Sequence, residues 1–104
     1  ESEEKAVKMT GAEKQNALDG MSFIMAEFAD IMKKGFSPEG ENTQSLCKKL
    51  QQFITDNFYT CTKPILAGLG QMYVADERFR NNIDFFGEGT AEFAGRAIAA
   101  FCRR

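Results

Sequence analysis

Residues 69–84 read LGQMYVADERFRNNID, and they contain the boundary between two predicted helices. The first of these helices starts at Pro64, where the missing N–H of proline costs least. Asp76 is a good N-cap for the second helix, over 77–86, because its carboxylate accepts a free backbone N–H. Three apolar side chains of this second helix are spaced to point inward: Phe79, Ile83 and Phe86. The stretch therefore predicts two consecutive helices that share one core.

The rest of the chain continues the helical pattern on both sides of this stretch. Residues 12–34 form the strongest predicted helix, because apolar side chains recur there at steps of three and four. Its stripe consists of Leu18, Met21, Met25, Phe28 and Met32. Gly35 supplies a left-handed stop, and further helices are expected over 43–61 and, with Thr90 as N-cap, over 91–102. No long segment alternates with period two, so the sequence predicts an all-α domain of five helices.

Composition excludes several kinds of chemistry. The chain has 104 residues, enough for one hydrophobic core without metal or disulfide staples. It contains no His, which excludes histidine-based catalysis and a His-ligated haem. Fifteen acidic and thirteen basic residues give a net charge of −2, unlike the basic surface of a typical nucleic-acid-binding domain. Without a phosphate-binding glycine motif or cysteines at zinc-finger spacing, we expect neither an enzyme nor a metal or cofactor site.

The three cysteines, Cys47, Cys61 and Cys102, are an odd number and do not indicate a disulfide framework. Cys47 and Cys61 fall on one predicted helix, about 21 Å apart, which is too far for a disulfide. Free thiols indicate a cytoplasmic protein. No apolar run reaches membrane-spanning length and no signal peptide opens the chain, so we expect no membrane association. The charged residues 1–9 are expected to be the remnant of a linker, with the domain itself over 10–104.

A few residues break the helical pattern. Phe23 lies on the polar face of the first predicted helix, and Tyr59 lies off the apolar stripe of the next. Each is either an ordinary surface aromatic or a wall of a hydrophobic cleft. Asn57 is a polar residue inside an apolar stripe, so it is either a satisfied core Asn that joins helices or a polar anchor for a ligand. Met25 belongs to a Met-rich stripe that is either core or an adaptable ligand wall.

Residues 69–84 also resemble a known pattern. They closely resemble the LGxMYxxDxRFxxNID stretch of the TipAS-type antibiotic-recognition domain. That family is best known as the C-terminal effector module of MerR-type transcription activators. The resemblance extends upstream through Asn57, Tyr59 and Cys61, and it covers nearly the whole chain from Thr10.

This resemblance implies an all-α, globin-like fold that binds no haem. It also implies a cleft between helices that takes up bulky, largely apolar antibiotics such as thiopeptides. In the full-length regulators, ligand binding is relayed through a dimerising coiled coil to an N-terminal winged-helix domain that binds DNA. This chain lacks those parts, so we expect DNA binding only through another domain and a homodimeric full-length protein. The candidate ligand-binding residues are Phe23, Met25, Asn57, Tyr59, Cys61 and Tyr73.

Packing explains most residues of the motif, with two exceptions. Tyr73 combines an apolar body with a polar tip, which suits the edge of a cleft. Arg78 is expected to form an ion pair with Asp84 or Glu77.

The sequence departs from the family at Gly68. The family position associated with covalent capture of thiopeptides is a cysteine, and here it is Gly68. Cys61 matches another family cysteine, to which no such role is assigned. A glycine has no thiol that could attack an electrophilic ligand, so we predict reversible, non-covalent binding.

Two other functions stay open. A stand-alone protein that sequesters an antibiotic would use the same domain. A protein-interaction module would instead use Phe23 and Tyr59 to contact a partner protein.

Overall fold

The computed structural model describes residues 11–104, with side chains described from Asp19 onward. Its helices are α2 (Gly11–Lys33), α3 (Glu41–Asn57), α4 (Lys63–Ala75), α5 (Glu77–Asp84) and α6 (Thr90–Cys102). Residues 11–104 contain no β-strand, so the prediction of an all-α domain with five helices is confirmed. The expected linker over residues 1–9 and the start of the domain at Thr10 lie outside the described residues.

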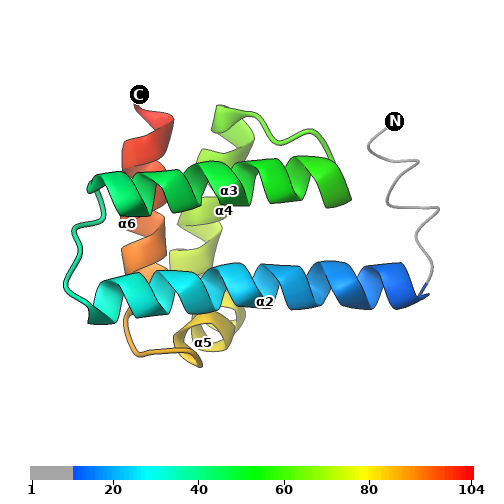
Figure 1. The fold of residues 1–104 in the computed structure, drawn as a ribbon, viewed down its shortest axis with the longest axis horizontal. Helices are drawn as coiled ribbons and strands as arrows, with labels where there is room; N and C mark the ends of the chain where they lie inside the picture. Colours follow the sequence, from blue (N-terminus) through cyan, green and yellow to red (C-terminus); the bar gives the residue numbers. More distant parts are fainter. Residues whose placement is uncertain (1–10) are drawn as a thin grey trace.

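The helices form two layers, as Figure 1 shows. α2 and α3 run antiparallel in the front layer, while α4 and α6 run antiparallel behind them and across them, with α5 at the lower end of α4. α4 and α6 make the most extensive contact between two helices, and α6 also packs against α2, α3 and α5. The hydrophobic core therefore lies between the two layers, with α6 as its central helix.

The predicted apolar stripes build this core. Side chains with no exposed surface come from α2, α3, α4 and α6: Phe28, Leu50, Leu66 and Ile98. Met25 of α2 is also buried, while Met21 and Met32 are half-buried and pack against the core. The stripe that the sequence predicts for this helix thus faces inward wherever the structure describes its side chains.

Two predicted helix ends are confirmed. Gly35 has a φ of +86°, and the Phe36 N–H bonds the Ile31 carbonyl at 3.2 Å. This is the Schellman closure, which ends α2 and requires a residue that tolerates positive φ. At the start of α5, Asp76 Oδ1 accepts the Arg78 N–H at 2.9 Å, as its predicted role as N-cap requires.

The start of α6 differs from the prediction. Thr90 is the first residue of the helix, and the N-cap position is Gly89, which has a φ of +90° and no capping side chain. Instead, Asp84 Oδ1 accepts the Ala91 N–H at 2.8 Å. A carboxylate is favoured at the positive end of a helix, so Asp84 takes over the capping role and ties the end of α5 to the start of α6.

The end of α3 also differs, because the helix stops at Asn57 and not at residue 61. Asn57 Nδ2 donates to the Phe53 carbonyl of its own helix at 2.9 Å. The Tyr59 N–H reaches back five residues to the Ile54 carbonyl at 3.2 Å. Such local bonds compete with the regular helical pattern, which explains the early end.

The loop after α3 is held by side chains of that helix. Gln51 Nε2 donates to the Cys61 carbonyl at 2.9 Å, and the Cys61 N–H donates to Thr55 Oγ1 at 3.0 Å. Cys61 is therefore fixed in a loop, and the predicted distance to Cys47 along one helix does not apply. All three cysteines are free thiols in the structure.

Gly68 and Gly70 of α4 form a matched pair for substitution. A Cβ at Gly68 would meet no atom within 4 Å, whereas one at Gly70 would lie 2.9 Å from Ile98 Cγ2 of α6. We expect Gly68→Ala to raise the free energy of unfolding by about 0.5–1 kcal/mol, because Ala favours the helix. Gly70→Ala should lower it by about 1–3 kcal/mol, because α6 must move away. Urea unfolding followed by circular dichroism measures both, and a gain in stability for Gly70→Ala would contradict the close approach.

Candidate functional site

An apolar cavity of about 360 Å³ lies between α2, the end of α3, α4 and α5. It is lined by Met21, Ser22, Met25, Phe58, Tyr73, Phe79, Asn82, Ile83 and Phe86. Aromatic and methionine side chains dominate this lining, and none of its residues is charged. A concave, mostly apolar site with a few polar groups is typical of binding sites for small molecules.

One face of α5 and of the turn after it forms a large part of the lining. Its members follow the spacing i, i+3, i+4 and i+7: Phe79, Asn82, Ile83 and Phe86. This spacing places them on one side of the helix. On α2, Met21 and Met25 lie one turn apart, and their flexible thioether side chains adapt to irregular shapes. The cavity is thus the space that two apolar helix faces leave between them.

Tyr73 forms the α4 side of the cavity. Its side chain is 6% exposed, and its ring centroid lies 6.1 Å from that of Phe79. Burial, with smaller effects of the nearby Tyr59 and Cys61, raises the pKa of Tyr73 to about 12. The hydroxyl therefore stays protonated at neutral pH and remains able to donate a hydrogen bond.

The structure brings two of the six predicted ligand-binding residues, Met25 and Tyr73, into the cavity lining. Tyr59 and Cys61 are close enough to Tyr73 to influence its pKa, but they do not line the cavity. Tyr59 is 38% exposed and Cys61 is buried, and of the segment directly after α3 Phe58 lines the cavity.

Phe23 and Asn57, the other two predicted residues, lie outside the lining. Phe23 is 71% exposed on α2. Asn57 is half-buried and its Nδ2 donates within its own helix, so this bond does not join two helices. A role of either residue in ligand binding stays a prediction.

Arg78 pairs with Asp76, and not with Asp84 or Glu77 as expected. Its Nη2 lies 3.2 Å from Asp76 Oδ2. The hydrogen bond between the two side chains lowers the pKa of Asp76 and raises that of Arg78. The Arg78 side chain is exposed and that of Asp76 is partly exposed, so solvent screens this pair and it contributes little to stability. Arg78 belongs to the cap of α5 and is not part of the cavity lining.

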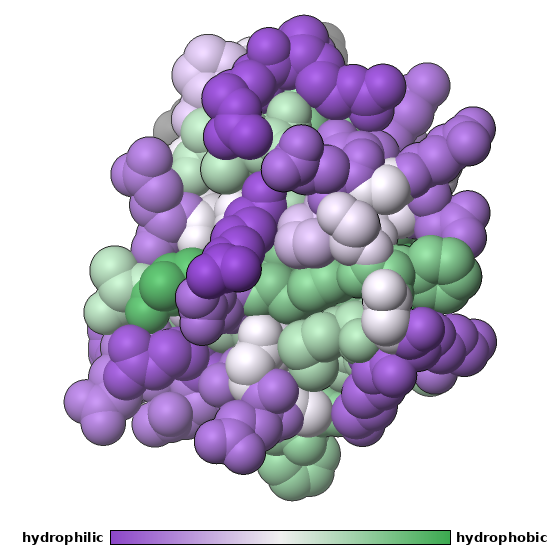
Figure 2. Space-filling model, turned by 90° about the vertical axis from the view of Figure 1, so that its left-hand side faces the viewer, coloured by the Kyte–Doolittle hydropathy of each residue, from purple (hydrophilic) through white to green (hydrophobic). Residues whose placement is uncertain are grey.

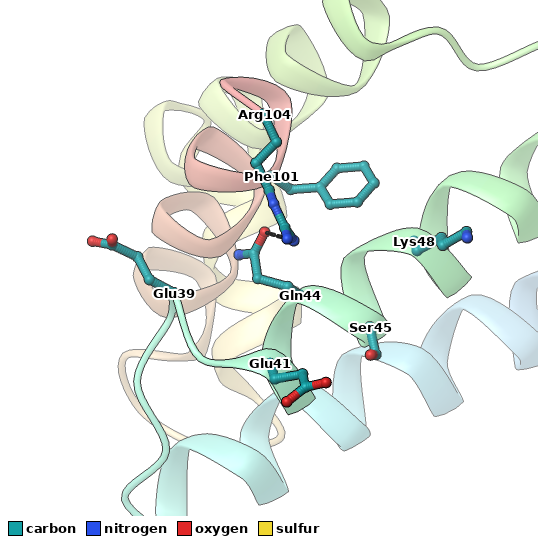
Figure 3. A pocket seen from close by; sticks show the side chains of 7 residues that line it. All are labelled: Glu39, Glu41, Gln44, Ser45, Lys48, Phe101 and Arg104. Atoms are coloured by element: carbon teal, nitrogen blue, oxygen red, sulfur yellow. Dashed lines mark hydrogen bonds between the residues drawn. The ribbon is translucent and has the colours of Figure 1, made fainter.

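A larger cavity of about 470 Å³ lies near the end of α6. Figure 3 shows the side chains that line it: Glu39, Glu41, Gln44, Ser45, Lys48, Phe101 and Arg104. Arg104 Nη1 lies 3.4 Å from Gln44 Oε1, whereas the Glu39 carboxylate points away from both. The lining is mainly polar and charged, which does not suit an apolar molecule. The cavity beside α5 is therefore the candidate site.

Hydrophobic side chains also reach the surface where α2 passes into α3. Figure 2 shows this end of the molecule, with a hydrophobic band between two hydrophilic areas. A shallow cavity of about 240 Å³ at this end includes Met32 and Phe93, together with the charged Glu92 and Arg96. Its charged rim sets it apart from the cavity beside α5.

A comparison with models of known protein families identifies the family of this chain. The model of the TipAS antibiotic-recognition domain matches residues 1–101. The chain belongs to this family. The resemblance of residues 69–84 to the TipAS pattern is thereby confirmed over nearly the whole chain.

The TipAS domain is similar to parts of longer regulators. It is 37% identical over 91 residues to the HTH-type transcriptional activator mta of Bacillus subtilis (strain 168), covering 81% of this chain and 35% of that protein. It is 32% identical over 100 residues to the HTH-type transcriptional activator TipA of Streptomyces coelicolor, covering 96% of this chain and 40% of that protein. The chain thus spans between 35% and 40% of the length of these relatives.

A solved structure shares the fold. It is TipAS from Streptomyces lividans in complex with the thiopeptide antibiotic nosiheptide, with a TM-score of 0.88 and 32% identity. The match covers 99% of this chain and 72% of that one. The fold that the resemblance implies for this TipAS domain is confirmed.

Two features are absent from the residues that the structure describes. None of their helices combines the length and the apolar character needed to cross a membrane. They also contain no group of three or more acidic or cysteine side chains placed to hold a metal ion. The apolar cavity remains the candidate site of the TipAS domain.

Proposed function

We propose that this TipAS domain is the ligand-sensing part of a MerR-type transcriptional activator and that its apolar cavity binds a hydrophobic antibiotic or drug-like molecule. The observation that carries the proposal is the 360 Å³ cavity beside α5. Four aromatic and two methionine side chains line it. The solved relative with the same fold is a complex with a thiopeptide antibiotic, which supports a ligand of this class.

The proposal places the domain in a larger protein. Both curated relatives are HTH-type transcriptional activators, which supports a DNA-binding part outside residues 1–104. The domain itself then acts by binding a ligand and not by catalysis. Such an activator works in the cytoplasm, and a homodimer would match the two-fold symmetry that many operators have.

Nosiheptide is the first ligand to test. At a concentration of 100 times Kd, a ligand that binds only the folded state stabilises it by about 2.7 kcal/mol. In a domain of this size, that corresponds to a rise in Tm of about 10–20 °C. Thermal unfolding with and without nosiheptide measures the shift, and isothermal titration calorimetry gives the stoichiometry. An unchanged Tm at concentrations well above micromolar would speak against the proposed function.

Binding should be reversible and leave no covalent adduct. Burial raises the pKa of Cys47 to about 12, and it also raises the pKa values of Cys61 and Cys102. A raised pKa keeps a thiol protonated at pH 7–8, and the protonated thiol is a poor nucleophile. Intact-mass spectrometry after incubation with nosiheptide should therefore give the mass of the unmodified chain.

The control for this experiment is Gly68→Cys. A Cβ at Gly68 meets no atom within 4 Å, so this variant presents an accessible thiol on α4. Iodoacetamide should label it faster than it labels the wild-type protein. A stable nosiheptide adduct on Cys61 of the wild-type protein would show that the reversible mode is wrong.

A further inference from the structure

The lining of the apolar cavity includes three polar side chains, and what they recognise depends on the proposed function of the cavity. They belong to Ser22 and Asn82, which are exposed, and to the buried Tyr73. Within the described part of the chain, none of these side chains makes a hydrogen bond to another residue. No side-chain nitrogen or oxygen of the described residues is fully buried without a partner, so the Tyr73 hydroxyl is open to the cavity or to solvent.

These three groups are all neutral. A tyrosine hydroxyl is protonated at neutral pH, and burial raises the pKa of Tyr73 further, to about 12. The Ser22 hydroxyl and the Asn82 amide each offer both a donor and an acceptor. No residue of the lining is charged, so an ionised ligand group would be buried there without a partner of opposite charge. The part of a ligand that enters the cavity is therefore uncharged.

The walls also restrict the shape of the ligand. The rings of Phe58, Phe79 and Phe86 line the cavity from the end of α3 and from α5. Aromatic walls favour a flat aromatic group that stacks on them or meets them edge to face. Met21 and Met25 on α2 adapt to its outline.

We infer that the cavity binds an uncharged aromatic group that bears a carboxamide, and that Asn82 recognises the carboxamide with help from Ser22. An amide needs both a donor and an acceptor from its partner, and Asn82 supplies the two from one side chain. Asn82 lies on α5 and Ser22 on α2, so two helices present polar groups to the same ligand. The cavity is otherwise apolar, which makes this contact the main source of orientation.

Asn81 provides a matched control for Asn82. Both residues are exposed on α5, but only Asn82 lines the cavity. If Asn82 merely faced solvent, Leu at either position would have the same effect. Because both side chains are exposed, neither substitution should unfold the domain, and a thermal melt of each variant checks this.

The test compares acridine with acridine-9-carboxamide, two flat aromatic molecules that differ by one amide group. Isothermal titration calorimetry at pH 8 keeps both uncharged. We expect the wild-type protein to bind the carboxamide about tenfold more tightly, the effect of a well-made pair of neutral hydrogen bonds. Asn82→Leu should reduce this ratio to about one, Ser22→Ala should reduce it in part, and Asn81→Leu should leave it unchanged.

Several results would overturn the inference. They are equal affinity of the wild-type protein for the two molecules, binding of neither, or a preference that survives Asn82→Leu. A nosiheptide titration of the same preparation separates the role of Asn82 from the proposed function of the cavity. If nosiheptide binds and the preference is absent, only the role of Asn82 is wrong. If nosiheptide does not bind at all, the proposed function itself is wrong.

Discussion

Phe28→Ala should lower the free energy of unfolding by about 3–5 kcal/mol, because the ring is fully buried and its removal leaves a cavity in the core. Domains of this kind have a total stability of only about 5–15 kcal/mol, so the variant should lose a large share of it. Urea unfolding followed by circular dichroism gives the difference. Met25 and Ile24, which neighbour Phe28 on α2, are also buried, so little rearrangement is available to fill the space.

Phe23→Ala is the control on the same helix. Phe23 lies five residues before Phe28, about 140° away around the helix axis, and it is 71% exposed. Its removal should change stability by no more than about 0.5 kcal/mol. Equal losses for the two substitutions would mean that the rotation of α2 about its axis is wrong.

Phe79→Ala should weaken nosiheptide binding by about tenfold or more. The ring lines the cavity beside Tyr73, and burying a Phe side chain against a ligand is worth about 1.5–3 kcal/mol. Phe79 is 38% exposed in the free domain, so its loss should affect folding much less than the loss of a core ring. Isothermal titration calorimetry of the variant and the wild type measures the change in Kd.

Phe36→Ala is the matched control for this substitution. Phe36 is 42% exposed, nearly the same as Phe79, but it lies in the loop after α2 and outside the cavity lining. Its substitution should leave the Kd for nosiheptide unchanged. A similar loss of affinity in both variants would place the ligand somewhere other than the cavity beside α5.

The helices could be predicted from the sequence because burial repeats at helical spacing. Asp76 and Gly35 also set helix ends through local chemistry that a short stretch of sequence contains. The end of α3 was harder, because the apolar stripe continues past Asn57 while its side chain bonds the preceding turn. The residue that caps α6 could not be predicted from the sequence next to the helix start. Asp84, which accepts the Ala91 N–H, lies seven residues before Ala91.

The cavity depends on how helices pack, and sequence periodicity does not contain that information. The spacing on α5 correctly predicts that Ile83 is buried in the core, but the inward position predicted for Phe79 is wrong, because this ring is 38% exposed and lines the cavity. The spacing also does not show that space remains between α5 and α2. Residues that break the helical pattern did not indicate which side chains line the cavity. Phe23 breaks the pattern and is exposed, whereas Met25 follows the pattern and lines the cavity. Tyr73 was found because it belongs to the family motif.

α5 is a short helix that is fixed at each end by a carboxylate hydrogen bond. It is 8 residues long, or about 12 Å. The Asp76 carboxylate caps its start, and the Asp84 carboxylate at its end accepts the Ala91 N–H of α6. One face of α5 lines the cavity, and Asp84 at its end is hydrogen-bonded to the first turn of α6. A displacement of that face is therefore coupled to the central helix of the domain both through the Asp84–Ala91 bond and through Ile83, which belongs to the core and to the cavity lining.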